Sequence, residues 1–183
     1  SVKTKIPKVL KNKLHNKKIG QIYKNFAKSL RIKENFIVAV SGGPDSLALA
    51  FLSKIYSIQK KLKVKYYIID HKLRLESTIE AKYVKEILKK FYINAEILRW
   101  HGKKPRNNIQ SSARTKRFEF LFSKCKKFGI TKILLGHHQE DLFENFFIRI
   151  LRGSGLKGLI SFGEKTKLDK ITILRPLINQ KKE

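Results

Sequence analysis

The sequence has 183 residues, enough for one domain, and 42% of them are hydrophobic, which excludes a globally disordered chain. Its 42 lysines and arginines outnumber 14 aspartates and glutamates, for a formal net charge of +28. We therefore expect nucleic acid as a partner, with a lysine-rich composition bias as the alternative. No apolar run is long enough to cross a bilayer, and the single cysteine excludes an intramolecular disulfide, so we expect a cytoplasmic protein with no membrane partner.

The first 33 residues contain eleven lysines and arginines and no acidic residue. Apolar side chains recur among them at helical spacing, at Ile19, Ile22, Tyr23, Phe26 and Leu30. This pattern predicts a basic N-terminal helical extension over residues 1–34 that packs on a catalytic domain over residues 35–183. The charged face of the helix is either a contact for RNA or a solvated surface.

Strand and helix patterns alternate through the rest of the chain. Short runs rich in β-branched and aromatic residues predict strands at 36–40, 64–69, 95–98, 132–135 and 171–174. Amphipathic stretches predict helices at 46–60, 78–91 with Ser77 as N-cap, 109–128 and 140–151, and residues 153–170 are predicted to form a mobile loop. The alternation is typical of an α/β fold, a five-stranded parallel sheet flanked by helices on both faces.

Polar residues cluster directly after three of the predicted strands, at 41–46, 70–74 and 137–141. Parallel sheets bind ligands at the carboxyl ends of their strands, near a switch in strand order. The coincidence of three clusters predicts a binding site at that edge of the sheet.

The first cluster, SGGPDS, has the features of an anion site. Gly42 and Gly43 allow close backbone approach, and Pro44 suits the first position of a helix. The N–H groups at a helix start bind anions, and Ser41 and Ser46 add hydroxyl donors. No Gly-Lys-Ser/Thr follows, so the pattern is not that of a Walker A loop.

Asp45 places a carboxylate beside the predicted phosphate site. The two anions repel each other unless a cation lies between them, and Mg2+ commonly binds one or two carboxylates together with phosphate oxygens. Asp45 is therefore the predicted magnesium ligand. The alternative is that Asp45 only stabilises the helix dipole as a first-turn acid.

Two further pairs of charged residues stand at i,i+3 spacing, which puts each pair on one helix face. Arg114 and Arg117 suit bidentate contact with phosphate, or form a solvated basic face. Asp141 and Glu144 are suited to hold a substrate ammonium group; a zinc site with the preceding histidines is the weaker alternative. The apolar stripe beside the arginines consists of Phe118, Leu121, Phe122 and Cys125, and Cys125 is expected in the core.

The stretch SGGPDS resembles the PP-loop of ATP pyrophosphatases, whose fold is adenine nucleotide alpha-hydrolase-like and Rossmann-like. Together with DHKLR, QSSARTKR, GHHQEDLFEN, RILRGSGLKGL and RPL, in that order, it resembles the N-terminal catalytic domain of the tRNA(Ile)-lysidine synthetase family over roughly residues 35–178. Glu140 and Asn145 depart from the usual family pattern, and family members usually continue into helical and C-terminal domains that help to grip tRNA.

The resemblance implies a ligase that uses ATP and Mg2+ to join L-lysine to C2 of the wobble cytidine in the CAU anticodon of tRNA(Ile), through an adenylated cytidine, with release of AMP and pyrophosphate. The alternatives are another PP-loop tRNA-modifying enzyme and a non-catalytic RNA-binding domain; the oligomeric state stays open, a homodimer included. The implied catalytic residues are Asp45, Arg114, Arg117, Asp141 and Glu144. The implied nucleotide-binding residues are Ser41, Gly42, Gly43, Pro44, Asp45, Ser46, His71, Arg74, Gly136 and His137.

Overall fold

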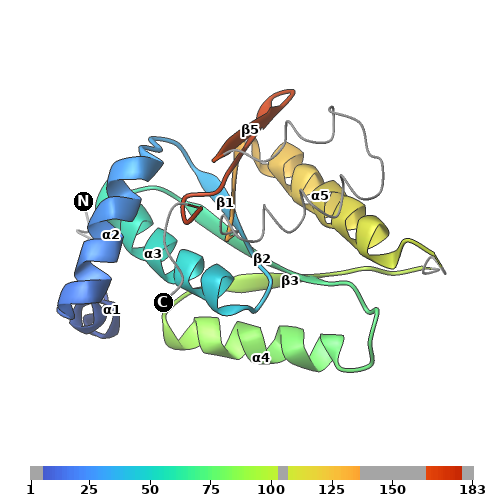
Figure 1. The fold of residues 1–183 in the computed structure, drawn as a ribbon, viewed down its shortest axis with the longest axis horizontal. Coiled ribbons are helices and arrows are strands. Elements are labelled where there is room, and N and C mark those ends of the chain that lie inside the picture. The colour runs from blue at the N-terminus through green and yellow to red at the C-terminus, as the bar shows by residue number, and fades with distance from the viewer. Residues whose placement is uncertain (1–5, 103–106, 137–163, 179–183) are drawn as a thin grey trace.

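The computed structural model describes residues 6–102, 107–136 and 164–178 of the chain (Figure 1). Helices and strands alternate over most of this length, as the sequence pattern predicts. In chain order they are α1 (Lys8–Leu14), α2 (Lys17–Leu30), β1 (Phe36–Val40), α3 (Pro44–Lys60), β2 (Val64–Asp70), α4 (Ser77–Lys90), β3 (Ala95–Arg99), α5 (Ile109–Phe128), β4 (Lys132–Leu135), β5 (Lys165–Leu168) and β6 (Ile171–Leu174).

The strands form one six-stranded sheet in the order β3-β2-β1-β4-β6-β5. The first five of these strands are parallel, and β5 pairs with β6 in the antiparallel direction. The five predicted strands are therefore confirmed, each to within one residue at its ends. The strand order reverses between β1 and β4, which is the switch point where sheets of this kind bind ligands.

Strand β5 corrects the prediction of a loop that reaches residue 170. It forms a hairpin with β6 in which Leu168 pairs with Ile171, so Asp169 and Lys170 make a two-residue turn. Asp169 has a positive φ of 52°, a conformation that Asp tolerates better than most residues. Lys165 and Lys167 are exposed on this edge strand, where charged side chains discourage pairing with other chains. Because an edge strand needs no apolar run, the sequence pattern did not reveal it.

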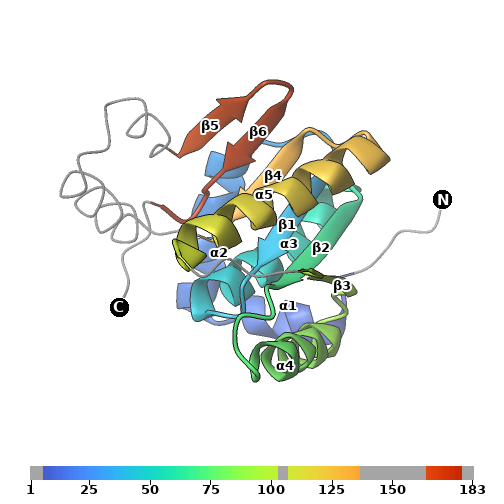
Figure 2. The same cartoon turned by 90° about the vertical axis from the view of Figure 1, so that its right-hand side faces the viewer.

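Helices cover both faces of the sheet and create two apolar cores (Figure 2). On one face, Phe36, Val38 and Val40 of β1 pack with side chains from α1, α2, α3 and α4. On the other face, Ile37 and Ala39 pack with side chains of α5. Alternate residues of a strand point to opposite faces, so covering both faces buries every residue of β1.

The basic N-terminal segment forms two helices instead of the single helix that was predicted. The side chain of Asn16 accepts hydrogen bonds from the N–H groups of Lys18 and Ile19, at 3.0 and 3.2 Å, and so caps the start of α2. Tyr23 and Phe26 are buried against the main core, while the lysines of α1 and α2 remain exposed. A domain boundary after residue 34 stays a prediction.

The link from β2 to α4 is organised by the buried carboxylate of Asp70, which is 1% exposed. Its Oδ1 accepts from the N–H of Lys72 and the hydroxyl of Ser77, both at 3.0 Å, and its Oδ2 accepts from the hydroxyl of Thr78 at 2.7 Å. Ser77 was predicted as the N-cap of this helix but is the first residue of α4. Its hydroxyl donates to Asp70 and does not cap the helix. The three bonds fix the loop that carries His71.

Burial raises the pKa of the Asp70 carboxyl, but the bonds from Thr78, Lys72 and Ser77 together outweigh it and leave the pKa below its usual range. A carboxyl whose pKa is lowered on folding adds stability above its unfolded-state pKa, and that stability is lost as pH falls through the folded-state pKa. We expect Asp70→Asn to lower the free energy of unfolding at neutral pH by about 1–3 kcal/mol.

Urea unfolding of both proteins at neutral pH and at about pH 3 measures this contribution. The difference between wild type and variant should shrink toward the lower pH. Asp169→Asn, in the exposed turn of the β5–β6 hairpin, is the matched control. Equal stabilities of wild type and Asp70→Asn at neutral pH would contradict the role given to this carboxylate.

Candidate active site

A cavity of about 120 Å³ lies at the carboxyl ends of β1, β2 and β4, beside the strand-order switch. This volume is below the roughly 300–1,000 Å³ of pockets that enclose a whole ligand, so a bound nucleotide would extend beyond it. The cavity brings together five of the predicted site residues from separate parts of the chain. Its lining consists of Ala39, Val40, Ser41, Ser46, Ile69, His71, Arg117, Leu135 and Gly136.

The hydroxyl of Ser46 holds the loop between β1 and α3 in shape. Its Oγ accepts from the N–H groups of Ser41 and Gly42, at 3.2 and 3.1 Å, and donates to the carbonyl of Gly43 at 2.9 Å. Ser46 is 4% exposed. The Ser46 hydroxyl, which was predicted to donate to a ligand, thus donates within the loop itself. In this geometry Ser46 holds the loop backbone in position.

The two glycines of the loop have different surroundings. Gly42 has a φ of +95°, and a Cβ there would lie 2.7 Å from Cγ2 of Val84 on α4. This position therefore requires glycine for both its conformation and its packing. Gly43 has an ordinary φ of −67°, and a Cβ there would meet nothing nearer than the Ser41 hydroxyl, at 3.9 Å. The backbone at Gly43 is thus open to the approach of a ligand.

Gly136 brings the end of β4 against the first turn of α3. A Cβ at Gly136 would lie 2.8 Å from Cα of Ser46 and 2.9 Å from its backbone nitrogen. Only a residue without a side chain permits this contact. It fixes the start of α3 at the edge of the cavity.

Helix α3 begins with Pro44 and carries Asp45 half-buried in its first turn. First-turn N–H groups have no acceptor within their own helix, and with the helix dipole they favour an anion at this point. Within the described ranges, no group of three or more His, Cys, Asp or Glu side chains is arranged to hold a metal. The donor set here fits Mg2+ that takes one ligand from Asp45 and the others from phosphate oxygens and water.

Helix α5 supplies the opposite wall of the cavity through Arg117. Burial lowers the pKa of Arg117, and the positive charge of Arg114 lowers it further. Guanidinium groups nevertheless remain charged in proteins. The sequence did not distinguish these two arginines; the structure places Arg117, but not Arg114, in the lining of this cavity.

Arg175, a third arginine that the sequence analysis did not single out, lies near Arg114. Its side chain is 2% exposed, and its Nη1 donates to the hydroxyl of Thr166 at 2.8 Å. Burial lowers its pKa, and so does the charge of Arg114. The positive charge of Arg114 therefore acts on both Arg117 and Arg175. The sequence feature that could have identified Arg175 is its position directly after the strand at 171–174, within the RPL motif.

His71 and Arg74 lie on the same loop but in different environments. The ring of His71 faces the cavity and meets the edge of Trp100, with centroids 6.4 Å apart. Trp100, which sequence reasoning missed, is buried, and its backbone N–H donates to the backbone carbonyl of Asp70 at 2.9 Å. Arg74 is 72% exposed, pairs with Glu80 at 3.5 Å, and does not line the cavity.

Three predicted site residues, His137, Asp141 and Glu144, lie outside the described residues, as does the predicted helix at 140–151. Their roles stay predictions. Cys125 is buried in the α5 core, as predicted.

Comparison with protein families gives a match between residues 11–183 and the family described as PP-loop domain. A tRNA(Ile)-lysidine synthase of Orientia tsutsugamushi is 42% identical over 146 residues, which cover 80% of this chain and 33% of the relative. A protein of the same name from Wolbachia pipientis wMel is 36% identical over 161 residues, 86% of this chain and 37% of the relative. The chain thus spans about a third of the length of these curated relatives.

Among solved structures, the U34-tRNA thiolase NcsA from Methanococcus maripaludis, with its [4Fe-4S] cluster, superposes with a TM-score of 0.73. The superposition covers 87% of this chain and 58% of the thiolase at 18% identity, a likeness of fold alone. In the described parts of the chain, no helix has the length and apolar character needed to span a membrane. Because the family match takes in the whole sheet and the loop that shapes the cavity, the chain belongs to the PP-loop domain family.

Proposed function

We propose that this chain carries the catalytic domain of an enzyme that joins L-lysine to C2 of the wobble cytidine in the CAU anticodon of tRNA(Ile), at the expense of ATP. The names of the curated relatives support this substrate. The observation that carries the proposal is the cavity, which brings the predicted anion-binding loop at the start of α3 together with Arg117 at the carboxyl ends of β1 and β4.

The chemistry needs two steps because the C2 carbonyl of cytosine is a poor electrophile. Its oxygen attacks the α-phosphorus of ATP and displaces pyrophosphate. The lysine amine then attacks C2 and displaces AMP, which leaves with that oxygen. The loop amides and Arg117 would stabilise the charge on the phosphates during the first step.

Magnesium, when bound at Asp45, would neutralise part of the phosphate charge. The lysine amine has a pKa of about 10.4 in model peptides and must lose a proton before it attacks. We assign Asp141 and Glu144 to hold the ammonium group and accept that proton.

A sulfur-transferring PP-loop enzyme is the main alternative. Cys125, the single cysteine of the sequence, is 2% exposed, and burial raises the pKa of its thiol to about 11. A buried thiol of this kind is a poor thiolate nucleophile. This observation favours the lysine-transferring reaction.

The decisive experiment measures transfer of labelled L-lysine to tRNA(Ile) with a CAU anticodon, in the presence of Mg-ATP. A methionine tRNA, which carries the same anticodon on a different body, is the control. We expect incorporation into tRNA(Ile) with AMP formed in equal amount. ATP binding without lysine transfer would contradict the proposal for this chain acting alone, and transfer of sulfur would support the alternative.

The two loop glycines provide a matched pair of variants. Gly43→Ala should leave the free energy of unfolding within about 1 kcal/mol of wild type and weaken Mg-ATP binding at least about tenfold, because the added methyl group occupies the open approach. Gly42→Ala should instead lower the free energy of unfolding by about 1–3 kcal/mol, through its positive φ and its overlap with Val84.

Urea unfolding and titration calorimetry with Mg-ATP separate the two effects. Unchanged ATP affinity in Gly43→Ala would show that phosphate does not approach this part of the loop.

Arg117→Gln tests the opposite wall of the cavity. We expect kcat/KM for ATP in AMP formation to fall by about 10²–10³-fold, the usual effect of removing a group that stabilises transition-state charge. Lys126→Gln, which removes a positive charge from an exposed site on the same helix, should change it by less than about threefold. Equal losses of kcat/KM in the two variants would show that Arg117 acts only through the overall positive charge of the chain and not at the phosphates.

A further inference from the structure

Trp100, the single tryptophan of the sequence, is buried outside both apolar cores. It directly follows β3 and is 7% exposed. Among the described residues, neither of the two core clusters includes it. A large aromatic side chain usually gains its burial within a core. The burial of Trp100 therefore has to be explained by its other contacts.

The indole ring of Trp100 contacts His71, which lines the cavity. The two rings meet edge to face, with an interplanar angle of 81° and centroids 6.4 Å apart. Aromatic pairs prefer this arrangement, and it stabilises them beyond the area that they bury. Among the described residues that line the cavity, His71 is present and Trp100 is not. Trp100 therefore supports His71 from outside the cavity.

The register of β2 and β3 makes these two residues neighbours. Asp70 and Arg99 are paired at the ends of the two parallel strands, so the next residues along the chain are His71 and Trp100. The backbone N–H of Trp100 donates to the carbonyl of Asp70 at 2.9 Å, and Nε of Arg99 lies 4.0 Å from Oδ2 of Asp70. The end of β3 thus holds the loop of His71 through both backbone and side chain.

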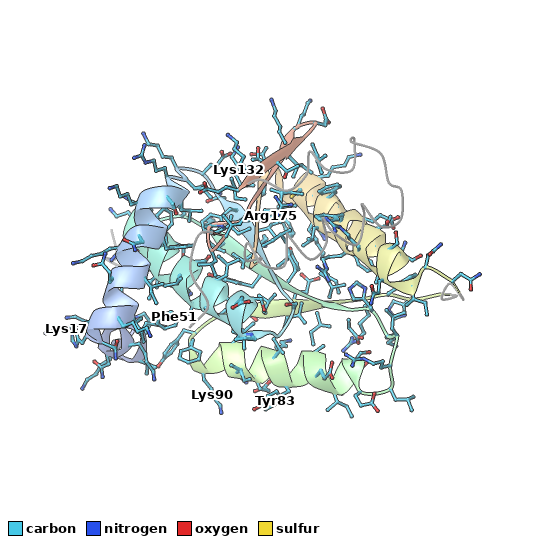
Figure 3. All side chains as sticks on the ribbon, in the orientation of Figure 1. Lys17, Phe51, Tyr83, Lys90, Lys132 and Arg175 are labelled. Carbon is cyan, nitrogen blue, oxygen red and sulfur yellow. The ribbon has the colours of Figure 1, made fainter. Side chains whose placement is uncertain are left out.

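Helix α5 contacts the same indole ring through Lys116. Its Nζ lies 5.9 Å from the centre of the ring, within the range of a cation–π contact. The next residue of α5, Arg117, lines the cavity. Figure 3 shows the end of β3, the loop before α4 and the start of α5 on the same side of the ribbon. Trp100 thus connects the two elements that carry His71 and Arg117.

We propose, on the basis of the function proposed above, that Trp100 is a positioning residue that holds the His71 ring ready for Mg-ATP in the cavity. An imidazole ring that turns freely about its side-chain bonds loses this freedom when a ligand binds, and the loss weakens binding. Contact with Trp100 restricts the ring before the ligand arrives. The ligand then binds more tightly, although Trp100 does not touch it.

Titration calorimetry with Mg-ATP tests this effect in two variants of Trp100. Trp100→Leu keeps an apolar side chain but removes the ring, and we expect it to weaken binding about three- to tenfold. Trp100→Phe keeps a ring and should bind within about twofold of wild type. Phe122→Leu, which removes a ring beside the α5 core and away from the cavity lining, is the matched control and should bind as wild type does. Thermal unfolding checks that each variant is folded at the temperature of the titration.

A double-mutant cycle tests whether Trp100 acts through His71. In a His71→Asn background, Trp100→Leu should weaken Mg-ATP binding by less than about twofold, because the ring that Trp100 positions is gone. An equal loss of affinity in both backgrounds would overturn the proposal. So would a wild type that binds Mg-ATP no more tightly than Trp100→Leu does.

Fluorescence of the single tryptophan tests the contact without a ligand. An imidazole ring in contact with indole quenches its emission, so His71→Asn should raise the emission of Trp100. His101→Asn, at the exposed position next to Trp100 in the chain, is the control and should leave the emission unchanged. Equal emission of wild type and His71→Asn would overturn the proposal for Trp100 alone. A wild type that shows the quenching but does not bind Mg-ATP would contradict the proposed function, and the positioning of His71 for a nucleotide with it.

Discussion

The candidate site depends on the contact between the end of β4 and the first turn of α3. Gly136 lies so close to the backbone of Ser46 that no side chain fits between them. This contact sets α3 so that its N-terminal turn opens at the strand-order switch. The hydroxyl of Ser46 then folds the loop back on the helix. Packing on one side and hydrogen bonding on the other thus hold the loop that is predicted to bind an anion in one conformation.

Arg117 supplies the positive charge in the lining of the cavity, and Arg114 lies near it. Burial lowers the pKa values of Arg117 and Arg175, and the positive charge of the nearby Arg114 lowers both further. Cations held close together in a partly buried site gain more from a bound anion than the same cations in water. The basic character that the composition indicates therefore includes Arg117 at the cavity as well as the lysines exposed on α1 and α2.

The sequence predicted what depends on local periodicity and missed what depends on tertiary contacts. All five parallel strands and the full extent of α5 follow from apolar patterning, because both faces of the sheet are covered. Strand β5 was missed because its exposed lysines carry no apolar signal. The loop motif identified Ser46, but only the structure shows that its hydroxyl bonds to Gly43. Trp100 contacts His71, and Arg175 lies near Arg114, through long-range packing that no spacing rule contains.

Asp70 links the loop that lines the cavity to the start of α4. Its carboxylate bonds to the loop after β2 and to the first two residues of α4, Ser77 and Thr78. His71 on this loop lines the cavity, and Leu75 on the same loop is exposed. A buried carboxylate with several hydrogen bonds is a rigid connection, because breaking any of them leaves a polar group unsatisfied in the interior. These hydrogen bonds therefore hold the loop that carries His71 in place relative to the start of α4.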